Sequence, residues 1–361
     1  MAGSQMLSAA RLPAAIAAAF LLATSAGAQA EVRFLDHRNK LIVLESPPKK
    51  LVSMFASGPL VYYAVDGGSD HLAGVRRDGL EMFRDSIYGE IIPEFLKLKD
   101  NVAGEGFVPN VEAILELKPD VVLQWTFDPK IIEPMERVGL KVVGWNCCTN
   151  QDRRDYLTLS GYTSGRIDRA QMILQKQDAS DKALRDVFGG TKPDDFVGIL
   201  VVDQIKDSIR IVANSSQDFS LSGARNLAAD KTGEWWRTVD AEQLLVWNPA
   251  VIVIPAYATD LKPADFYGNP LFASLDAVKN KRVYKFPQFN RSPDAPEIYL
   301  SDDWLARVAN PSRFQDSKAF RETIKAGYKI IYQKDLTEDQ IRSVLELEQN
   351  KDSAGYSDIF G

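Results

Sequence analysis

Arginine and aromatic side chains recur directly after apolar stretches of this sequence. The positions singled out are Phe55, Ser57, Arg76, Arg77, Trp125 and Trp145 in the first half and Tyr257, Phe289 and Arg291 in the second. A guanidinium group hydrogen-bonds to carboxylate, catecholate or similar oxygens, and aromatic rings bury flat or apolar surface. These residues predict contacts to a small molecule that offers both kinds of surface. The competing interpretation assigns about half of the aromatic residues to core packing.

A wider set of polar and aromatic residues follows other apolar stretches and could line the same site. Its members are Phe107, Asp203, Gln204, Trp235, Trp236 and Asn290. Ser57-Gly58-Pro59 also stands directly before a helix expected over residues 60–65. Backbone N–H groups at the start of a helix can hold an oxyanion. The same three residues suit an ordinary helix cap followed by proline, and both interpretations stay open here.

The sequence contains few residues that could bind a bare metal ion or act in catalysis. It has two histidines, His37 and His71, and two cysteines, Cys147 and Cys148, with no spacing typical of a metal site. It contains no glycine-rich phosphate loop and no nucleophile elbow. We therefore expect no catalytic residues, no residues that coordinate a metal ion and no cofactor. For the adjacent cysteines, two buried thiols are favoured over a strained disulfide.

The N-terminal 30 residues have the pattern of a cleavable secretory signal. Arg11 is the only charged residue before Glu31, an apolar run follows it, and Ala28-Gln29-Ala30 precedes the expected cleavage point. The apolar run is too short to span a bilayer comfortably. We expect a periplasmic protein that begins at Glu31. Its net charge of −6 gives no support to nucleic-acid binding.

Short apolar strands and helices alternate along the rest of the chain. Strands are expected at 51–55, 72–75, 120–125, 141–145, 196–202, 208–213, 251–254 and 282–286, and helices at 111–117, 131–138, 241–245, 271–278, 297–309, 317–332 and 338–349. Residues 32–44 are expected to form a hairpin. Alternation of this kind is typical of parallel sheets covered on both faces.

An internal repeat divides the chain into two similar halves. Residues 110–123 and 240–253 both contain a glutamate at the start of a short helix, a proline at its end and an apolar strand directly after. A long helical stretch over 153–188 lies between the copies. We therefore predict an α/β fold with two parallel-sheet lobes joined by one long helix, and a ligand cleft between the lobes. The expected divisions are a signal peptide over 1–30, an N-terminal lobe over 31–152, the linking helix over 153–190, and a C-terminal lobe with terminal helices over 191–361.

These repeated segments resemble the helical-backbone class of substrate-binding proteins of ABC importers, which serve vitamin B12, haem and ferric siderophores. The stretches that carry the resemblance are residues 36–52, 109–120, 241–249 and 277–284, followed by Ser292-Pro293, Trp304-Leu305-Ala306 and residues 335–341. Each motif is loose by itself, and their order and spacing make the match specific.

The resemblance implies a carrier and not an enzyme. It implies one exposed glutamate on each lobe, Glu112 and Glu242, that docks onto arginines of an ABC permease dimer; a position in the first helical turn explains the same residues structurally. The expected cargo is a metal chelate of the iron–siderophore type, with an oxyanion such as molybdate or tungstate, haem or cobalamin as alternatives. The protein is expected to be a monomer. The rival classes are a periplasmic hydrolase and a binding or sensing module without a transporter.

Overall fold

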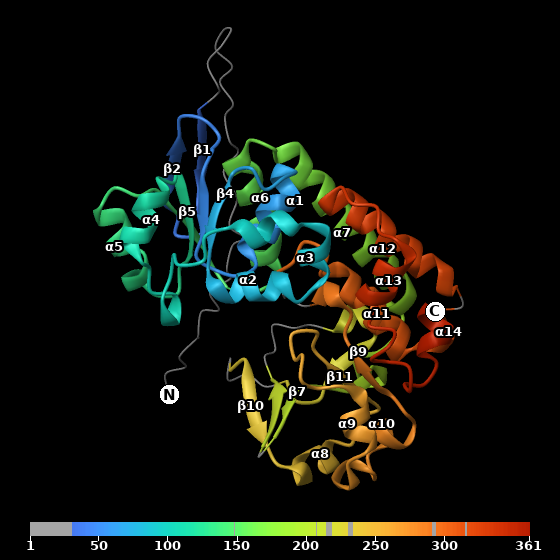
Figure 1. Ribbon diagram of the computed structural model, residues 1–361. Helices are drawn as coiled ribbons and strands as arrows, with labels where there is room; N and C mark the ends of the chain where they lie inside the picture. Colours follow the sequence, from blue (N-terminus) through green and yellow to red (C-terminus); the bar gives the residue numbers. More distant parts are fainter. Residues whose placement is uncertain are drawn as a thin grey trace, which may run out of the picture.

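The computed structural model describes residues 31–147, 149–206, 208–213, 219–229, 234–290, 294–314 and 316–361. The expected signal over 1–30 and the predicted contact Arg291 lie outside the described residues. Figure 1 shows two sheet-containing lobes, one above the other, with helices along one side of both. The predicted two-lobed α/β architecture is confirmed.

The first lobe is built on a parallel sheet in the order β4-β3-β5-β6. Its strands are β3 (Leu51–Ser53), β4 (Leu72–Val75), β5 (Val121–Trp125) and β6 (Val142–Trp145), and its helices are α1 (Gly58–Asp66), α2 (Arg77–Arg84), α3 (Ile87–Ile91), α4 (Val111–Leu117) and α5 (Glu133–Arg137). Every residue of β3, β5 and β6 is buried, as expected for a parallel sheet with both faces covered. The predicted hairpin is present as β1 (Val32–Leu35) and β2 (Leu41–Leu44), which pair antiparallel.

The second lobe contains a six-stranded sheet in the order β10-β8-β7-β11-β12, with β9 also paired to β7. Its strands are β7 (Val197–Ile205), β8 (Ile209–Val212), β9 (Ala224–Asn226), β10 (Trp236–Val239), β11 (Val251–Ile254) and β12 (Val283–Lys285), and its helices are α8 (Ala241–Trp247), α9 (Pro263–Tyr267) and α10 (Asp276–Lys279). β9, β7, β11 and β12 run parallel, whereas β8 pairs antiparallel with both β7 and β10. A tight turn after β7 returns the chain as β8, so this half of the sheet needs no crossover helix.

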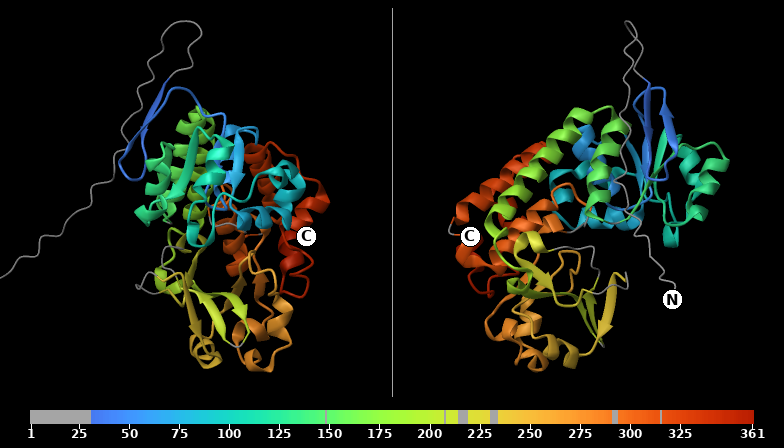
Figure 2. Two further views of the ribbon diagram at one scale, coloured as in Figure 1. Left: turned by 60° about the vertical axis from the view of Figure 1, so that its left-hand side comes forward. Right: turned by 180° about the vertical axis from the view of Figure 1, so that it is seen from behind.

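The stretch predicted as one linking helix forms two helices, α6 (Asn150–Ser164) and α7 (Ile167–Phe188). Gly165 ends α6 in the left-handed conformation, with φ of 73°, which glycine adopts without steric strain. α6 packs against α1 of the first lobe, and α7 continues from there to α11 of the second. Seen from behind in Figure 2, α7 runs along the back of the molecule from the upper lobe toward the lower one.

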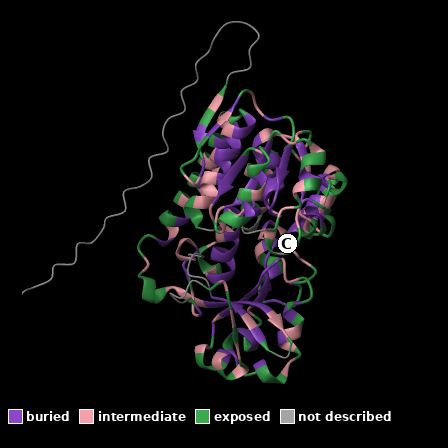
Figure 3. Cartoon of the chain, turned by 90° about the vertical axis from the view of Figure 1, so that its left-hand side faces the viewer, coloured by how far each residue is buried: buried purple, intermediate pink, exposed green. Residues whose placement is uncertain are grey.

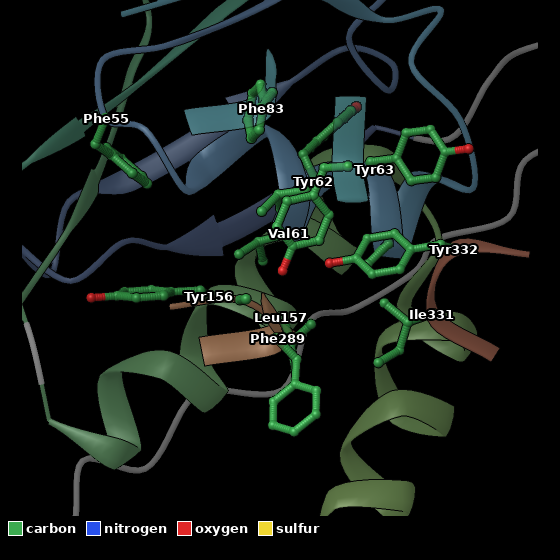
Figure 4. Packing of buried hydrophobic residues seen from close by; sticks show 14 of the residues in the cluster. Phe55, Val61, Tyr62, Tyr63, Phe83, Tyr156, Leu157, Phe289, Ile331 and Tyr332 are labelled. Atoms are coloured by element: carbon green, nitrogen blue, oxygen red, sulfur yellow. The ribbon is translucent and has the colours of Figure 1, made fainter. Parts of the chain in front are cut away.

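The C-terminal helices are α11 (Tyr299–Ala309), α12 (Ser317–Tyr332), α13 (Glu338–Val344) and α14 (Tyr356–Phe360). α12 contacts α1 and α13 contacts α3, so both helices reach the first lobe as well as the second. The main hydrophobic core accordingly continues from the first sheet into α11 and α12. Figure 3 shows the central strands of both sheets buried, and Figure 4 shows Tyr62 and Tyr63 of α1 close to Tyr332 of α12.

Candidate functional site

A cavity of about 140 Å³ lies where α6 meets the second lobe, and we call it the inter-lobe cavity. Its lining comes from α6, α7, both arms of the β7–β8 hairpin and the segment that leads into α11. The polar and aromatic members are Asn150, Arg153, Arg154, Gln177, Asp181, Phe219, Trp235, Tyr257, Phe286, Asn290, Asp294, Tyr299, Ser301 and Asp302. Strand ends and a helix start therefore meet at the expected place between the lobes.

Among the side chains that line this cavity, Arg153 has the features most typical of a ligand-binding residue. Thr149 and Asp152 form a capping box that starts α6 just after β6, and this places Arg153 in the first turns of the helix. Its side chain is 10% exposed, and Nη1 donates to Asn150 Oδ1 at 2.8 Å. Within the described part of the chain, Nε and Nη2 are buried without a hydrogen-bond partner. A buried guanidinium with free donors is a site for an anion.

Ser57, at the start of α1, is connected to this guanidinium through Asp294. Its hydroxyl donates to Asp294 Oδ2 at 3.0 Å, and Asp294 Oδ1 lies 3.5 Å from Arg153 Nε. Ser57 is the N-cap residue of α1, yet its side chain makes no capping hydrogen bond. Burial raises the pKa of Asp294, and the Arg153 charge and the Ser57 hydrogen bond oppose that shift.

Aromatic side chains form the opposite wall. Trp235 and Tyr257 line the inter-lobe cavity, and the Tyr257 hydroxyl lies 3.4 Å from the carboxylate of Asp203. Arg210 Nε donates to the same carboxylate at 2.9 Å. Burial and the nearby Asp203 charge raise the pKa of Tyr257, so the phenol stays neutral. The wall presents apolar ring surface and a fixed hydroxyl to a ligand.

Arg76 and Arg77 lie elsewhere, in a pocket of about 790 Å³ on the first lobe. We call this the first-lobe pocket, and it is lined by residues 76–78, 81, 100–101, 103–104 and 108–110. The Arg76 guanidinium stacks over Phe107 at 4.0 Å, and Phe107 meets the exposed Phe127 edge-on at 5.7 Å. Arg77 pairs with Asp100 at 3.0 Å. The structure does not bring these two arginines to the lining of the inter-lobe cavity.

Four predicted aromatic contacts are buried in the main core. Phe55 stacks on Trp125 at 4.0 Å, and Trp145 stacks on Tyr156 at 4.4 Å. Phe289 is also fully buried. None of the four lines the two cavities described here. Their assignment as ligand contacts stays a prediction, whereas Tyr257 lies at the cavity surface and Ser57 is one hydrogen bond from it.

Glu112 and Glu242 occupy equivalent, exposed positions in the first turns of α4 and α8. The residue two positions before each glutamate caps its helix: Asn110 accepts from Ala113 N, and Asp240 accepts from Gln243 N. Each helix also ends on a left-handed residue, Lys118 or Asn248. The internal repeat seen in the sequence is therefore a repeat in three dimensions.

Cys147 departs from the expectation of buried thiols, since it is exposed and disulfide-bonded. The other cysteine of the sequence, Cys148, lies outside the described residues. Among the described residues no group of three or more His, Cys, Asp or Glu side chains is arranged to hold a metal ion. Across the same residues, no helix is long and apolar enough to cross a bilayer.

Comparison with known proteins agrees with this architecture. Residues 99–288, more than half of the chain, match the periplasmic binding protein family. The chain belongs to this family. Members deliver small-molecule ligands to an ABC permease.

Individual relatives differ in their ligands. The Haemophilus influenzae molybdate-binding protein MolA is 26% identical over 253 residues, which cover 63% of this chain and 72% of MolA. Its structure with bound molybdate aligns with a TM-score of 0.71 at 20% identity, over 84% of this chain and 99% of that one. The Bacillus subtilis iron-uptake system-binding protein is 26% identical over 198 residues, covering 52% of this chain and 61% of that protein. A periplasmic solute binding protein from Veillonella parvula aligns with a TM-score of 0.79 at 21% identity, over 89% of this chain and 98% of that one.

Sequence reasoning missed the cavity residues of this periplasmic binding protein on α6 and before α11. The sequence places Asn150 in the N-terminal lobe and Arg153 at the start of the linking helix, and it does not single out Asp294. The capping box at Thr149 and Asp152 was the available signal, because it marks a helix that starts directly after a buried strand. No local pattern marks Asp294, whose partners are distant in sequence.

Proposed function

We propose that this protein captures a small, oxygen-rich anion in the inter-lobe cavity and delivers it to an ABC permease. The observation that carries the proposal is Arg153, a guanidinium nine-tenths buried in the cavity, two of whose nitrogen atoms have no hydrogen-bond partner among the described residues. Leaving such donors unpaired is unfavourable by roughly 1–3 kcal/mol or more, and an anion would relieve it. We further propose that the chain is a periplasmic carrier without catalytic activity.

An inorganic oxyanion is the first candidate ligand. The cavity volume of about 140 Å³ is below the roughly 300–1,000 Å³ that is usual for sites enclosing larger organic ligands. The similarity to a molybdate-binding protein supports the same choice. A tetrahedral oxyanion can accept hydrogen bonds from Arg153 and from the hydroxyl of Ser57 at once.

A metal chelate of the iron–siderophore type is the second candidate, and it is the cargo that the sequence favoured. The stacked Arg76 and Phe107, with the exposed Phe127 beside them, support it, because they would suit the flat anionic face of a chelate. The adjoining first-lobe pocket, of about 790 Å³, offers such a chelate more room than the inter-lobe cavity of about 140 Å³.

The decisive measurement is calorimetric titration of the purified protein with sodium molybdate and, separately, with a ferric tris-catecholate. For an oxyanion carrier we expect molybdate to bind and Arg153→Gln to weaken it roughly ten- to hundredfold, since charge-assisted hydrogen bonds are lost. The matched control is Arg166→Gln, because the Arg166 guanidinium lies outside the lining of the inter-lobe cavity and pairs with Asp168 at 3.9 Å. Binding of the chelate alone, lost on Arg76→Gln and kept in Arg153→Gln, would select the second candidate.

A further inference from the structure

The anion position beside Arg153 is already occupied by a carboxylate of the protein itself. Asp294 lies between Ser57 and Arg153, with its side chain 8% exposed. Ser57 belongs to the first lobe, whereas Asp294 belongs to the segment that follows β12 and leads into α11. One carboxylate thus joins residues from both walls of the inter-lobe cavity.

The surroundings of this carboxylate suit an anion independently of Arg153. Ser57 stands at the N-terminus of α1, a helix of nine residues, where the helix dipole favours negative charge. The Ser57 hydroxyl makes no capping bond within its own helix and donates to Asp294 instead. Gly58 follows, and a Cβ there would lie 2.1 Å from Ser53 Oγ. The close approach of this helix start to its neighbours therefore depends on glycine.

The contact between Asp294 and Arg153 is loose. The distance of 3.5 Å between Oδ1 and Nε is long for a charge-assisted hydrogen bond, which is usually about 2.7–2.9 Å. The two side chains therefore form an ion pair that leaves hydrogen-bond donors of the guanidinium unused. Among the described residues, Nε and Nη2 of Arg153 have no hydrogen-bond partner. An incoming oxyanion could approach these donors more closely than Asp294 does.

We propose that Asp294 is an internal stand-in for the ligand: its carboxylate neutralises Arg153 and bridges the lobes when the cavity is empty, and a bound oxyanion takes its place. The inference rests on the proposed function and adds a specificity-determining residue to it. Asp294 would set the affinity threshold, because a ligand must interact with Arg153 and Ser57 better than this carboxylate does. Weakly charged anions would be rejected for the same reason.

The test compares Asp294→Asn with Asp186→Asn in a titration with sodium molybdate, followed by tryptophan fluorescence, since Trp235 lines the same cavity. The amide keeps an oxygen that can accept from Ser57 but removes the charge that competes for Arg153. We expect Asp294→Asn to bind molybdate roughly tenfold or more tightly than wild type, as the loss of one nearby charge implies. Asp186 lies on α7 outside the cavity lining, is exposed and pairs with Lys182 at 2.6 Å, so its variant should stay within about twofold of wild type.

The outcomes separate this inference from the proposed function. Unchanged, weaker or undetectable molybdate binding by Asp294→Asn overturns the stand-in role, even if wild type binds molybdate through Arg153. Binding by Asp294→Asn but not by wild type supports the stand-in role and removes molybdate as the natural cargo. Equal gains in Asp294→Asn and Asp186→Asn would show a general charge effect and would also overturn it. Circular dichroism of each variant verifies that it is folded.

Discussion

Glu297 is an ionisable residue held entirely inside the molecule. It is 0% exposed and accepts hydrogen bonds from the hydroxyls of Tyr88 and Tyr332, each at 2.6 Å. Burial raises its pKa to about 7, and the two hydrogen bonds only partly oppose that shift. Tyr88 comes from α3 of the first lobe and Tyr332 from the end of α12. The carboxyl group therefore sits at the junction through which the C-terminal helices reach the first lobe.

This pKa makes a prediction for stability. The pKa of Glu297 rises from 4.5 to about 7 on folding, so the native state binds the proton more tightly than the unfolded chain. The stabilising contribution is complete below pH 4.5 and is lost as the pH rises through about 7. We expect the free energy of unfolding to fall by about 3 kcal/mol over this interval.

Urea denaturation at a series of pH values, with wild type, Glu297→Gln and the exposed control Glu133→Gln, measures this effect. The glutamine variant should lose most of the decrease between pH 4.5 and 7, because an amide does not titrate. The control should keep it. A Glu297→Gln protein with the same pH profile as wild type would contradict the assignment.

The N-terminal end of α1 is the element that depends most on a single residue. A Cβ at position 58 would lie 2.1 Å from Ser53 Oγ and 3.0 Å from Phe55 Cε2. Ser53 Oγ cannot move freely, since it donates to Phe55 O at 2.8 Å. Packing and hydrogen bonding around this turn therefore fix where α1 begins, and with it the position of Ser57.

Gly58→Ala should accordingly destabilise the protein by roughly 1–3 kcal/mol, the usual range for overpacking a filled core. Gly68→Ala is the matched control, because no atom lies within 4 Å of its added Cβ. Thermal unfolding of the two variants beside wild type checks the difference. If both variants melted at the same temperature, the close approach at Gly58 would not matter for stability.

At the scale of the whole molecule, the two lobes repeat one another while sharing a core. The repeat places Glu112 and Glu242 on equivalent exposed helices, whereas the main core runs from the first sheet through α1 into α11 and α12. A shared core restricts how far the lobes can move apart. Two docking carboxylates at a nearly fixed spacing would suit a permease dimer, and charge pairing would steer the encounter.

We predict that Glu112→Ala and Glu242→Ala each lower ligand uptake several-fold without changing ligand affinity. The reason is that both glutamates lie on the outer faces of α4 and α8 and outside the lining of the inter-lobe cavity. Uptake into cells and calorimetric affinity are measured on the same variants. Glu116→Ala serves as control, since Glu116 is exposed on α4 but its counterpart in the repeat is Val246. A glutamate variant with weakened ligand binding would argue against a docking role.

The sequence by itself determined the alternation of strands and helices, the internal repeat and the family resemblance. These features are local: β11 (Val251–Ile254), α4 (Val111–Leu117) and α12 (Ser317–Tyr332) have the bounds expected from apolar runs and capping residues. The sequence did not predict that Gly165 separates two helices, because a single glycine is also tolerated inside a helix.

Tertiary structure alone decided which residues line the candidate site. Trp125 and Trp145 follow the pattern of ligand contacts but stack with Phe55 and Tyr156 inside the core. Arg153 and Asp294 are 141 positions apart and meet Ser57 only because α6, α1 and the segment before α11 converge. Strand and helix signals are carried by neighbours in sequence, whereas a buried charge and its partner are brought together by packing between elements, which no local pattern encodes.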